Sequence, residues 1–462
     1  MPQDKLQDEL SEYVAAQAAE FGVPGVSVGV LLDGQEIYAS HGVTSLADPT
    51  PVDEKTLFPL ASVSKTFTAT ALMCLVAEGK VDLDAPVRRY VPELKLADER
   101  AAARITVLNL LNHTAGLDWN LIDDGEGDRS LAGLMAELPR LPLIAPPGTR
   151  ASYSQAGYNL AGRIVENVTG LPFEQAMSAL LFEPVGLPDT VYGLAEVMVR
   201  KFAVGYNRGD DGELRAARPW GAFREGGRRD NPGGGLASTV SDLLRWARFQ
   251  LGDGEGVLPA TELHRMREQT VALRASTLGD GFGICWFLHD LDGLHGIGHG
   301  GSGNGQFAEL LIVPERDFAV VSLANVGPDG YPFNQSVVRW ALEHCLGVVE
   351  KKPEPVPYDA ARARQVAGRY EIDAMNLDVA TDGTRLTLAV GIKPEIRAAS
   401  TEQMPPDYPA AAIGFLPDDG DEYIVTEGGL EGQRGYFSRD ADGTITGIDL
   451  AGRLFSRTSP AS

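Results

Sequence analysis

The chain has 462 residues, of which 44% are hydrophobic and 23% charged, a balance typical of a globular protein with a sizeable core. This length suggests two or three domains, or one large domain with a small one. The formal net charge of −24 argues against nucleic acid and anionic membrane surfaces as partners, because both would repel the chain.

The first segment, residues 1–23, predicts an amphipathic helix. It has acids at Asp4, Asp8, Glu9 and Glu12 and no uninterrupted apolar run, which argues against a secretory signal. No stretch of the sequence is long and apolar enough to span a bilayer. We therefore expect a soluble, cytoplasmic protein.

The cysteines indicate neither a disulfide framework nor a zinc site. Cys74, Cys285 and Cys345 are odd in number and scattered, and no Cys-x-x-Cys pair occurs. The histidines show no metal-ligand spacing either. We expect no metal and no other cofactor.

The first 350 residues predict a mixture of helices and antiparallel strands. Alternating apolar residues, punctuated by Asp33-Gly34, indicate a hairpin, and apolar residues at helical spacing indicate helices. In chain order we expect a hairpin within 23–42, a helix over 66–78 and a mainly helical region over 100–200. After these we expect a helix that is capped near 238–241 and ends at Leu251, two strands within 305–325 and a closing helix over 336–347.

The last hundred residues differ from the rest in composition and in the spacing of their turn residues. Residues 351–359 alternate proline with charge, which favours an extended linker. From 360 onward, short strand-like runs are separated by Asp-Gly and Gly turns. We predict a catalytic domain over 1–350, a linker over 351–359 and a small antiparallel barrel over 360–462.

One nucleophile motif is a chance match. Residues 25–29, Gly-Val-Ser-Val-Gly, fit the Gly-x-Ser-x-Gly elbow, which needs a sharp turn from a strand into a helix. Ser27 instead lies inside an alternating strand with no helix after it. It is interpreted as a small buried strand residue.

A second serine motif places a lysine at the spacing needed to accept the serine proton. In "ASVSK", Ser62 precedes Lys65 by one helical turn, so both side chains lie on the same face, whereas Ser64 is directed elsewhere. A neutral lysine can accept the serine proton if burial or nearby cations lower its pKa. Backbone N–H groups of a first helical turn can also stabilise an oxyanion. The alternative is that Ser62 only caps a helix.

Two further motifs offer partners for this pair. Tyr153, ahead of a helix in "ASYSQAGYNLAG", can share a proton with the lysine and relay it to a leaving group. In "GHGGSGNGQ", His299 is titratable, and Gly300 and Gly301 let a substrate approach an edge strand. The N–H of Ser302 is the candidate second oxyanion donor.

The order of the three motifs resembles that of the penicillin-recognising serine hydrolases, the branch that holds class C β-lactamases, D-aminopeptidases, DD-carboxypeptidases and related esterases. "LLNHTAGL" at 110–117 and "GGLAST" at 234–239 extend the resemblance over about residues 10–345. It implies an α+β fold of the β-lactamase/transpeptidase type, with an antiparallel sheet flanked by helices and a helical subdomain. It also implies Ser62 as nucleophile, Lys65 as general base, Tyr153 as proton shuttle and His299 in the third motif.

Position 155 departs from the family pattern. The second motif usually reads Tyr-x-Asn, and here Gln155 is one methylene longer. Its amide can still contact a substrate, but the change makes β-lactamase activity less expected.

Within the family, the chain looks similar to penicillin-binding-protein-type thioesterases of nonribosomal peptide assembly, which carry a lipocalin-like barrel. The resemblance implies a peptide delivered by a carrier protein, transferred to Ser62 and cyclised head-to-tail with a D-residue at the acyl end. A barrel arginine then holds the nucleophile end of the peptide. Arg434, Arg439 and Arg453 are candidates, with Arg453 preferred and a solvated surface role as the alternative.

Two other functions remain open from the sequence. A stand-alone esterase or D-amino-acid-specific peptidase would use the same residues and pass the acyl group of its ester or peptide substrate to water. A catalytically inactive binding protein would have lost a motif residue, yet Ser62, Lys65 and Tyr153 are all present.

Overall fold

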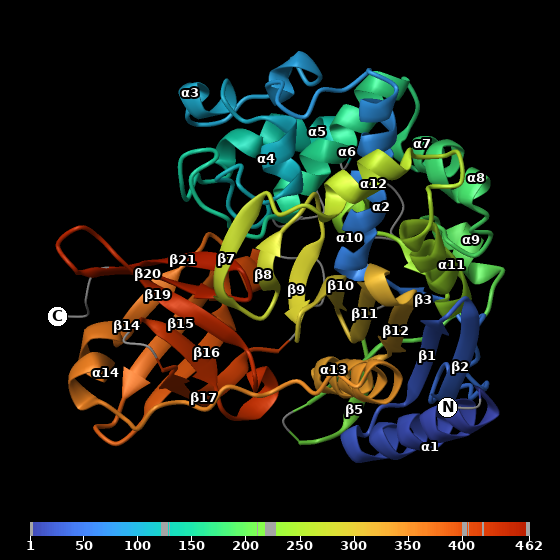
Figure 1. Cartoon of the computed structure of the whole chain (residues 1–462). Coiled ribbons are helices and arrows are strands. Elements are labelled where there is room, and N and C mark those ends of the chain that lie inside the picture. Colours follow the sequence, from blue (N-terminus) through green and yellow to red (C-terminus); the bar gives the residue numbers. More distant parts are fainter. Residues whose placement is uncertain are drawn as a thin grey trace.

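The computed structural model of the chain describes residues 3–121, 128, 130–209, 211–217, 228–399, 404, 406–417 and 420–458. Figure 1 shows a sheet with helices on both sides, a helical region beyond one end of it, and a separate barrel. The fold class expected from the sequence is confirmed. Within the described residues, no helix is long and apolar enough to cross a membrane.

The central sheet is antiparallel throughout and has eight strands. The predicted hairpin forms its edge, with Asp33 and Gly34 at φ of 49° and 75° in the turn. The order across the sheet is β2 (Gln35–Gly42), β1 (Gly25–Leu32), β12 (Phe318–Ala324), β11 (Gln306–Val313), β10 (Leu294–Gly303), β9 (Phe287–Leu291), β8 (Gly279–Phe282) and β7 (Val271–Ser276).

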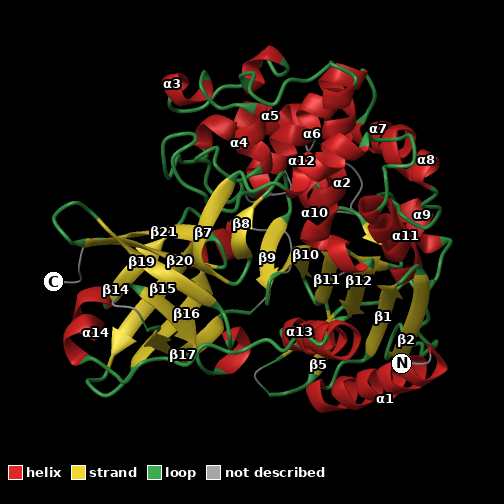
Figure 2. Ribbon diagram, viewed as in Figure 1, coloured by secondary structure: helices red, strands yellow, loops and turns green. Residues whose placement is uncertain are grey.

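Alternation along the strands divides the core between two layers (Figure 2). On β12, Ala319, Val321 and Leu323 face the large helical cluster, whereas Phe318 and Val320 face the opposite side. That opposite side is covered by α1 (Gln3–Phe21) and by α13 (Gly330–Ala341), which begins six positions before the closing helix expected from the sequence.

The helical region fills the space above the sheet. Its central helix α2 (Ser64–Ala77) is buried almost all round, so it lies in the core rather than on the surface. Around it stand α3 (Glu99–Ala102), α4 (Val107–Leu111), α5 (Leu131–Glu137), α6 (Gln155–Thr169), α7 (Phe173–Met177), α8 (Glu183–Val185), α9 (Leu194–Met198), α10 (Asn231–Gly234), α11 (Val240–Leu251) and α12 (Ala260–Arg267). The predicted cap of α11 is provided by Thr239, whose side chain accepts from the Asp242 amide.

Shorter pairings complete this part of the chain. The strand β3 (Phe58–Pro59) leads toward α2 and pairs with β6 (Ala237–Ser238). A second small sheet consists of β13 (Val326–Gly327), β4 (Tyr206–Arg208) and β5 (Leu214–Ala216).

The C-terminal part is a closed antiparallel barrel of eight strands. Its interior is filled by apolar side chains, including Tyr370, Tyr423 and Phe437. The strands are β14 (Gly368–Glu371), β15 (Met375–Thr381), β16 (Leu386–Ile392), β17 (Tyr408–Phe415), β18 (Glu422–Val425), β19 (Arg434–Arg439), β20 (Ile445–Leu450) and β21 (Arg453–Arg457), with α14 (Ala360–Val366) before them and α15 (Pro394–Ala399) after β16.

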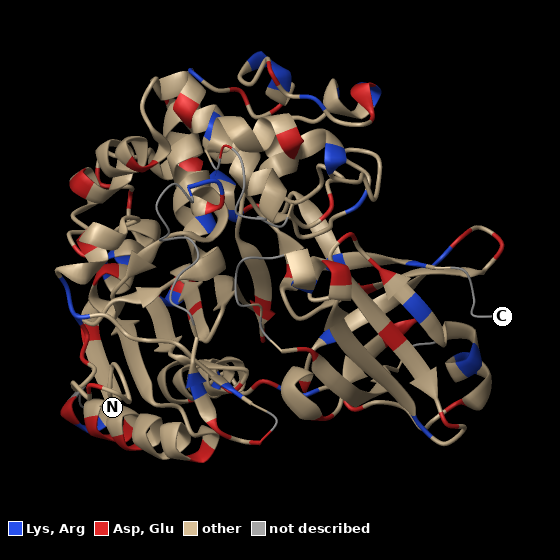
Figure 3. Ribbon diagram, turned by 180° about the vertical axis from the view of Figure 1, so that it is seen from behind, with Lys and Arg blue, Asp and Glu red and all other residues tan. Residues whose placement is uncertain are grey.

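The barrel lies against the β7 edge of the sheet (Figure 1). Thr277 Oγ1 donates to Gln433 Oε1 at 2.5 Å, and Arg274 pairs with Glu422. In the ribbon of Figure 3, Lys and Arg positions are scattered among those of Asp and Glu, in keeping with the acidic composition. The contact brings the barrel to the same end of the sheet as the candidate motifs.

Candidate active site

Ser62 lies in a tight helical turn, Ala61–Val63, that runs directly into α2. The Lys65 Nζ lies 3.1 Å from the Ser62 Oγ, as the one-turn spacing predicts. Ala61, immediately before the serine, has a φ of 44°, a left-handed conformation that is unfavourable for alanine. Ser62 is partly exposed while Lys65 is fully buried, so the pair has its hydroxyl toward solvent and its amine inside.

The other two serines have structural contacts. Ser64 is fully buried, and its Oγ accepts from the Leu236 amide at 3.1 Å. Ser27 is buried in β1, with its Oγ 3.2 Å from both the Ser40 hydroxyl and the Asp53 carbonyl. Neither hydroxyl is placed to attack a substrate.

The lysine has a dry, hydrogen-bonded environment. Its Nζ donates to Gln155 Oε1 at 2.6 Å and to the Gly233 carbonyl at 2.7 Å. Burial, with a smaller effect of the Arg453 charge, lowers the pKa of Lys65 to about 7 against the opposing effects of Cys285 and Asp230. A substantial fraction of the amine is therefore neutral near pH 7 and able to accept a proton.

Gln155 lies at the start of α6 and contacts the lysine. Its Nε2 is 3.3 Å from both the Asn159 Oδ1 and the Asp230 carbonyl, so both ends of the amide have partners inside the protein. The longer side chain has room because position 233 is glycine: a Cβ there would lie 2.1 Å from Gln155 Nε2. Contact with substrate remains a prediction for this residue.

Tyr153 lies on the other side of the pair. Its ring centroid is 4.9 Å from Lys65 Nζ, and its phenol is near enough to Ser62 for that side chain to affect the phenol pKa. Burial raises the pKa of Tyr153, and both the Ser62 contact and the Arg453 charge oppose that rise. The phenol is thus protonated near neutral pH and in position to donate.

The third motif forms the strand edge beside the serine. A Cβ on Gly301 would lie 2.0 Å from the Leu60 carbonyl and 3.3 Å from the Ser62 amide nitrogen, so only glycine lets β10 pass this close. Ser302 follows, exposed, on the same strand. The two amides proposed as oxyanion donors thus lie on adjoining segments.

His299 is less accessible than the sequence suggests. It is fully buried and stacks on Phe287 at 4.2 Å between ring centroids, with Nδ1 2.7 Å from the Gly300 carbonyl. Burial lowers the pKa of His299 to about 3, reinforced by the Lys65 charge. The ring is neutral at physiological pH, and its centroid lies 6.2 Å from that of Tyr153.

Among the three candidate arginines of the barrel, Arg453 reaches the motifs. Its guanidinium carbon lies 5.0 Å from the Tyr153 ring centroid and 5.8 Å from that of Trp119. Arg434 donates to the Ser276 carbonyl at 3.4 Å, and Arg439 pairs with Asp421 at 2.7 Å.

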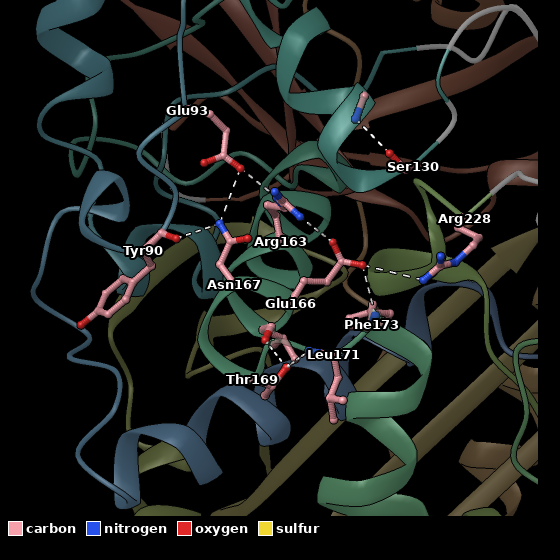
Figure 4. Close-up of polar contacts among 12 residues, drawn as sticks. Tyr90, Glu93, Ser130, Arg163, Glu166, Asn167, Thr169, Leu171, Phe173 and Arg228 are labelled. Carbon is pink, nitrogen blue, oxygen red and sulfur yellow. Dashed lines mark hydrogen bonds and ion pairs between the residues drawn. The ribbon is translucent and has the colours of Figure 1, made fainter.

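A charged network stabilises the segment that leads to Gly233. In Figure 4, Arg163 lies between Glu93 and Glu166, and Arg228 approaches Glu166 from the other side. Arg228 also forms a two-pronged pair with Glu174. The polypeptide after Arg228 is therefore tethered to helices α6 and α7 before it reaches the lysine.

Several residues near the lysine have no motif of their own in the sequence. Cys285 and Asp230 affect its pKa, and Tyr158 places its ring 5.5 Å from Nζ. His113 packs on the Tyr153 ring at 4.4 Å. Of these, His113 and Tyr158 lie in stretches that carried family resemblance, "LLNHTAGL" and "ASYSQAGYNLAG", and that resemblance indicated no contact of either residue with the lysine. In the described part of the chain, no group of three His, Cys, Asp or Glu side chains is suited to hold a metal.

The rate of acylation should rise with pH through about 7 and level off above it, because only neutral Lys65 can accept the Ser62 proton. Arg453→Met should move this midpoint upward, since the arginine charge disfavours the ammonium. The measurement is the acylation rate of an activated ester across pH. Arg439→Met, which removes an arginine paired elsewhere, should leave the midpoint unchanged. A flat profile, or a rate that falls through pH 7, would contradict the lysine assignment.

Comparison with known proteins agrees with this geometry. The β-lactamase family model matches residues 10–338. Penicillin-binding protein 4 of Amycolatopsis lactamdurans is 33% identical over 375 residues, covering 78% of this chain and 96% of that protein. Esterase EstB of Burkholderia gladioli is 32% identical over 293 residues, covering 56% of this chain and 73% of the esterase.

The structural likeness also includes the barrel. The crystal structure of SurE matches with a TM-score of 0.73 at 25% identity, covering 98% of this chain and 99% of that one. A second structure, of SurE with D-Leu, matches with a TM-score of 0.70 at 26% identity over the same shares of the two chains.

Proposed function

The chain belongs to the β-lactamase family, whose members are serine hydrolases, and from that premise we propose that it forms an acyl-enzyme on Ser62 and releases a peptide by head-to-tail cyclisation. The observation that carries the first half is the 3.1 Å contact between the Ser62 hydroxyl and a buried lysine amine whose pKa is lowered to about 7. Without that neutral base the hydroxyl would be a weak nucleophile.

Acylation begins with attack of the Ser62 oxygen on the carbonyl carbon of a peptidyl thioester. The hydroxyl proton passes to Lys65 Nζ, and the amides of Ser62 and Ser302 stabilise the oxyanion. When the tetrahedral intermediate collapses, the carbon–sulfur bond breaks. The thiolate takes a proton from Tyr153, which regains one from Lys65.

Release of the product reverses the proton path. The amine at the far end of the same peptide attacks the ester carbon and loses a proton through Tyr153 to Lys65. The ester bond then breaks, and the proton returns to the Ser62 oxygen. The net products are a cyclic peptide, the free thiol and unchanged enzyme.

Gln155, Gly300 and Gly301 are proposed to position the lysine and the substrate. Gln155 positions the lysine through the 2.6 Å hydrogen bond to its Nζ and offers its amide edge to the substrate. Gly300 and Gly301 let the acyl segment lie against β10.

The barrel side of the site favours transfer to an amine over hydrolysis. Arg453 and Trp119 lie next to Tyr153, so a peptide folded back on itself meets a cation and an aromatic surface instead of open water. The guanidinium is proposed to bind backbone carbonyls near the attacking amine. We propose a carrier protein as the donor of the thioester, and D-Leu in the SurE structure supports a D-residue at the acyl end.

A hydrolase is the second candidate, because one relative is named an esterase. It would use the same acyl-enzyme and differ only in passing the acyl group to water. Esters or linear D-peptides would then be the substrates.

Peptidyl thioesters that end in D- or L-residues distinguish the two functions. We expect cyclic product from the D-series and little turnover of the L-series, with products identified by mass spectrometry. The Ser62→Ala variant controls for spontaneous cyclisation and hydrolysis. If every thioester gives only linear acid, whatever its terminal stereochemistry, the hydrolase is the correct function.

A further inference from the structure

The turn between β20 and β21 of the barrel is hydrogen-bonded to the chain at Tyr153. The Tyr153 amide donates to the Gly452 carbonyl at 2.7 Å, and the Leu454 amide donates to Ser152 Oγ at 3.2 Å. The backbone N–H of the candidate proton shuttle thus has its partner on the barrel, about 300 positions further along the sequence.

The residues on either side of Tyr153 are held by the catalytic domain. The Ser152 amide donates to the His113 carbonyl at 2.9 Å, and the Ser154 amide donates to His113 Nδ1 at 3.1 Å. Tyr153 therefore lies between two supports, His113 on one side and the Gly452 carbonyl on the other. Of the hydrogen bonds within the described residues, the one to Gly452 is made by the Tyr153 main chain itself.

The turn has features that a connecting loop does not need. Ala451 and Gly452 both have left-handed conformations, with φ of 51° and 70°, and alanine is unfavourable there. A Cβ on Gly452 would lie 2.4 Å from Leu278 Cδ1, so the close approach to the catalytic domain requires glycine. The neighbouring turn offers a contrast: Gly443, at φ of 81°, has nothing within 4 Å of a Cβ.

A buried carboxyl supports the turn from inside the barrel. Asp449 is 5% exposed, and its backbone carbonyl accepts from the Tyr423 hydroxyl at 2.7 Å. Burial raises the pKa of its carboxyl to about 7, and the neighbouring Gly452 backbone N–H opposes that rise. The chain of contacts runs from Tyr423 through Asp449 and Gly452 to the Tyr153 main chain.

We propose that the β20–β21 turn is a positioning element of the active site, with Asp449 and Gly452 holding the Tyr153 main chain so that its phenol reaches Ser62. This inference rests on the proposed function for the catalytic part, whereas the tether itself does not. The barrel then acts on proton transfer directly, in addition to forming a wall of the site.

Gly452→Ala tests the tether, with Gly443→Ala as its matched control. Both substitutions place alanine at a left-handed position of a barrel turn, but only the first pushes against Leu278 and shifts the carbonyl that Tyr153 uses. We expect Gly452→Ala to lower the acylation rate constant by about 10- to 100-fold, with the dissociation constant of an activated ester changed by less than about two-fold. Gly443→Ala should stay within about two-fold in both quantities.

Repeating the substitution in the Tyr153→Phe variant distinguishes an effect on the position of the phenol from a general loss of structure. If the turn acts through the phenol, Gly452→Ala should cost almost nothing further once the hydroxyl is gone. The inference would be overturned if Gly452→Ala lowered the acylation rate constant by the same factor in the unaltered protein and in Tyr153→Phe. It would also be overturned if Gly452→Ala and Gly443→Ala had equal effects on that rate constant. If Gly452→Ala does not fold, Asp449→Ala takes its place, with Asp449→Asn expected to restore the rate because it keeps the size of the side chain and an oxygen near the Gly452 backbone N–H.

Hydrogen exchange tests the tether without using activity. In the unaltered protein, the Tyr153 amide should be protected, and Gly452→Ala should increase deuterium uptake at residues 152–154 while Gly443→Ala does not. Absence of acylation in the unaltered protein, together with this exchange pattern, would reject the proposed function and leave the tether standing. Unchanged uptake in Gly452→Ala would reject the tether.

Discussion

Ser62→Ala is expected to abolish acyl-enzyme formation and to lower turnover by about 10³- to 10⁶-fold, the range seen when a serine nucleophile is removed. The hydroxyl lies 3.1 Å from the buried Lys65 amine, whose pKa is lowered to about 7. Its removal deletes one oxygen from a partly exposed side chain, so the fold should be kept. Labelling with a fluorophosphonate and the steady-state rate on a thioester measure the two effects.

Ser64→Ala is the matched control for this prediction. The Ser64 hydroxyl accepts from the Leu236 amide in a fully buried position, so its loss should lower the free energy of unfolding by about 1–3 kcal/mol. Labelling should remain. Persistent labelling of Ser62→Ala would show that another residue is the nucleophile.

Lys65→Met and Tyr153→Phe should each lower the acylation rate by about 10²- to 10⁴-fold, and the double variant should be little slower than the slower single one. The reason is that both residues contact the Ser62 hydroxyl and transfer the same proton. Loss of either residue interrupts the proton path, so loss of the second should lower the acylation rate only slightly further. Single-turnover acylation rates of the unaltered protein, the two single variants and the double variant complete the double-mutant cycle.

Tyr158→Phe supplies the control for the tyrosine. Its ring also lies near the lysine, 5.5 Å from Nζ, but its hydroxyl donates to the Leu111 carbonyl at 2.9 Å. It should retain acylation within about ten-fold. Losses that multiply in the Lys65 and Tyr153 double variant would contradict the shared proton path.

Local rules explain why part of the site could be predicted from the sequence. The meeting of Ser62 and Lys65 depends only on the helical repeat, and the choice of Ser62 over Ser64 follows from the same repeat. Glycine at 301 also indicates a close approach, but the group that it approaches, the Leu60 carbonyl, lies far away in the sequence. The barrel was predictable because each of its hairpins has its own turn residues.

Contacts between distant segments could not be predicted in this way. Cys285 and Asp230 reach the lysine from separate loops, and the Gly452 carbonyl reaches Tyr153 from the barrel. These pairings depend on sheet order and on how the barrel docks, neither of which has a periodicity in the sequence. The strands β7 to β9 could not be predicted because they are short, and β8 and β9 contain Gly or Asp, which are unfavourable in strands.

His299 and Gln155 show where residue type alone is insufficient. A histidine in a glycine-rich strand suggests a titrating group, yet burial against Phe287 keeps this one neutral. Gln155 suggests an altered substrate contact, yet Gly233 leaves room for its extra methylene and its oxygen binds the lysine.

The most direct measurement is to find where the acyl group lies during turnover. The protein is mixed with a peptidyl thioester that ends in a D-residue, acid-quenched and mapped by mass spectrometry of its peptides. The acyl mass should lie on Ser62, and it should be absent from the same peptide of Ser62→Ala. An adduct on Ser64 or Cys285, or consumption of the thioester without any adduct on Ser62 in either a rapid or a slow quench, would contradict the acyl-enzyme on which the proposed function depends.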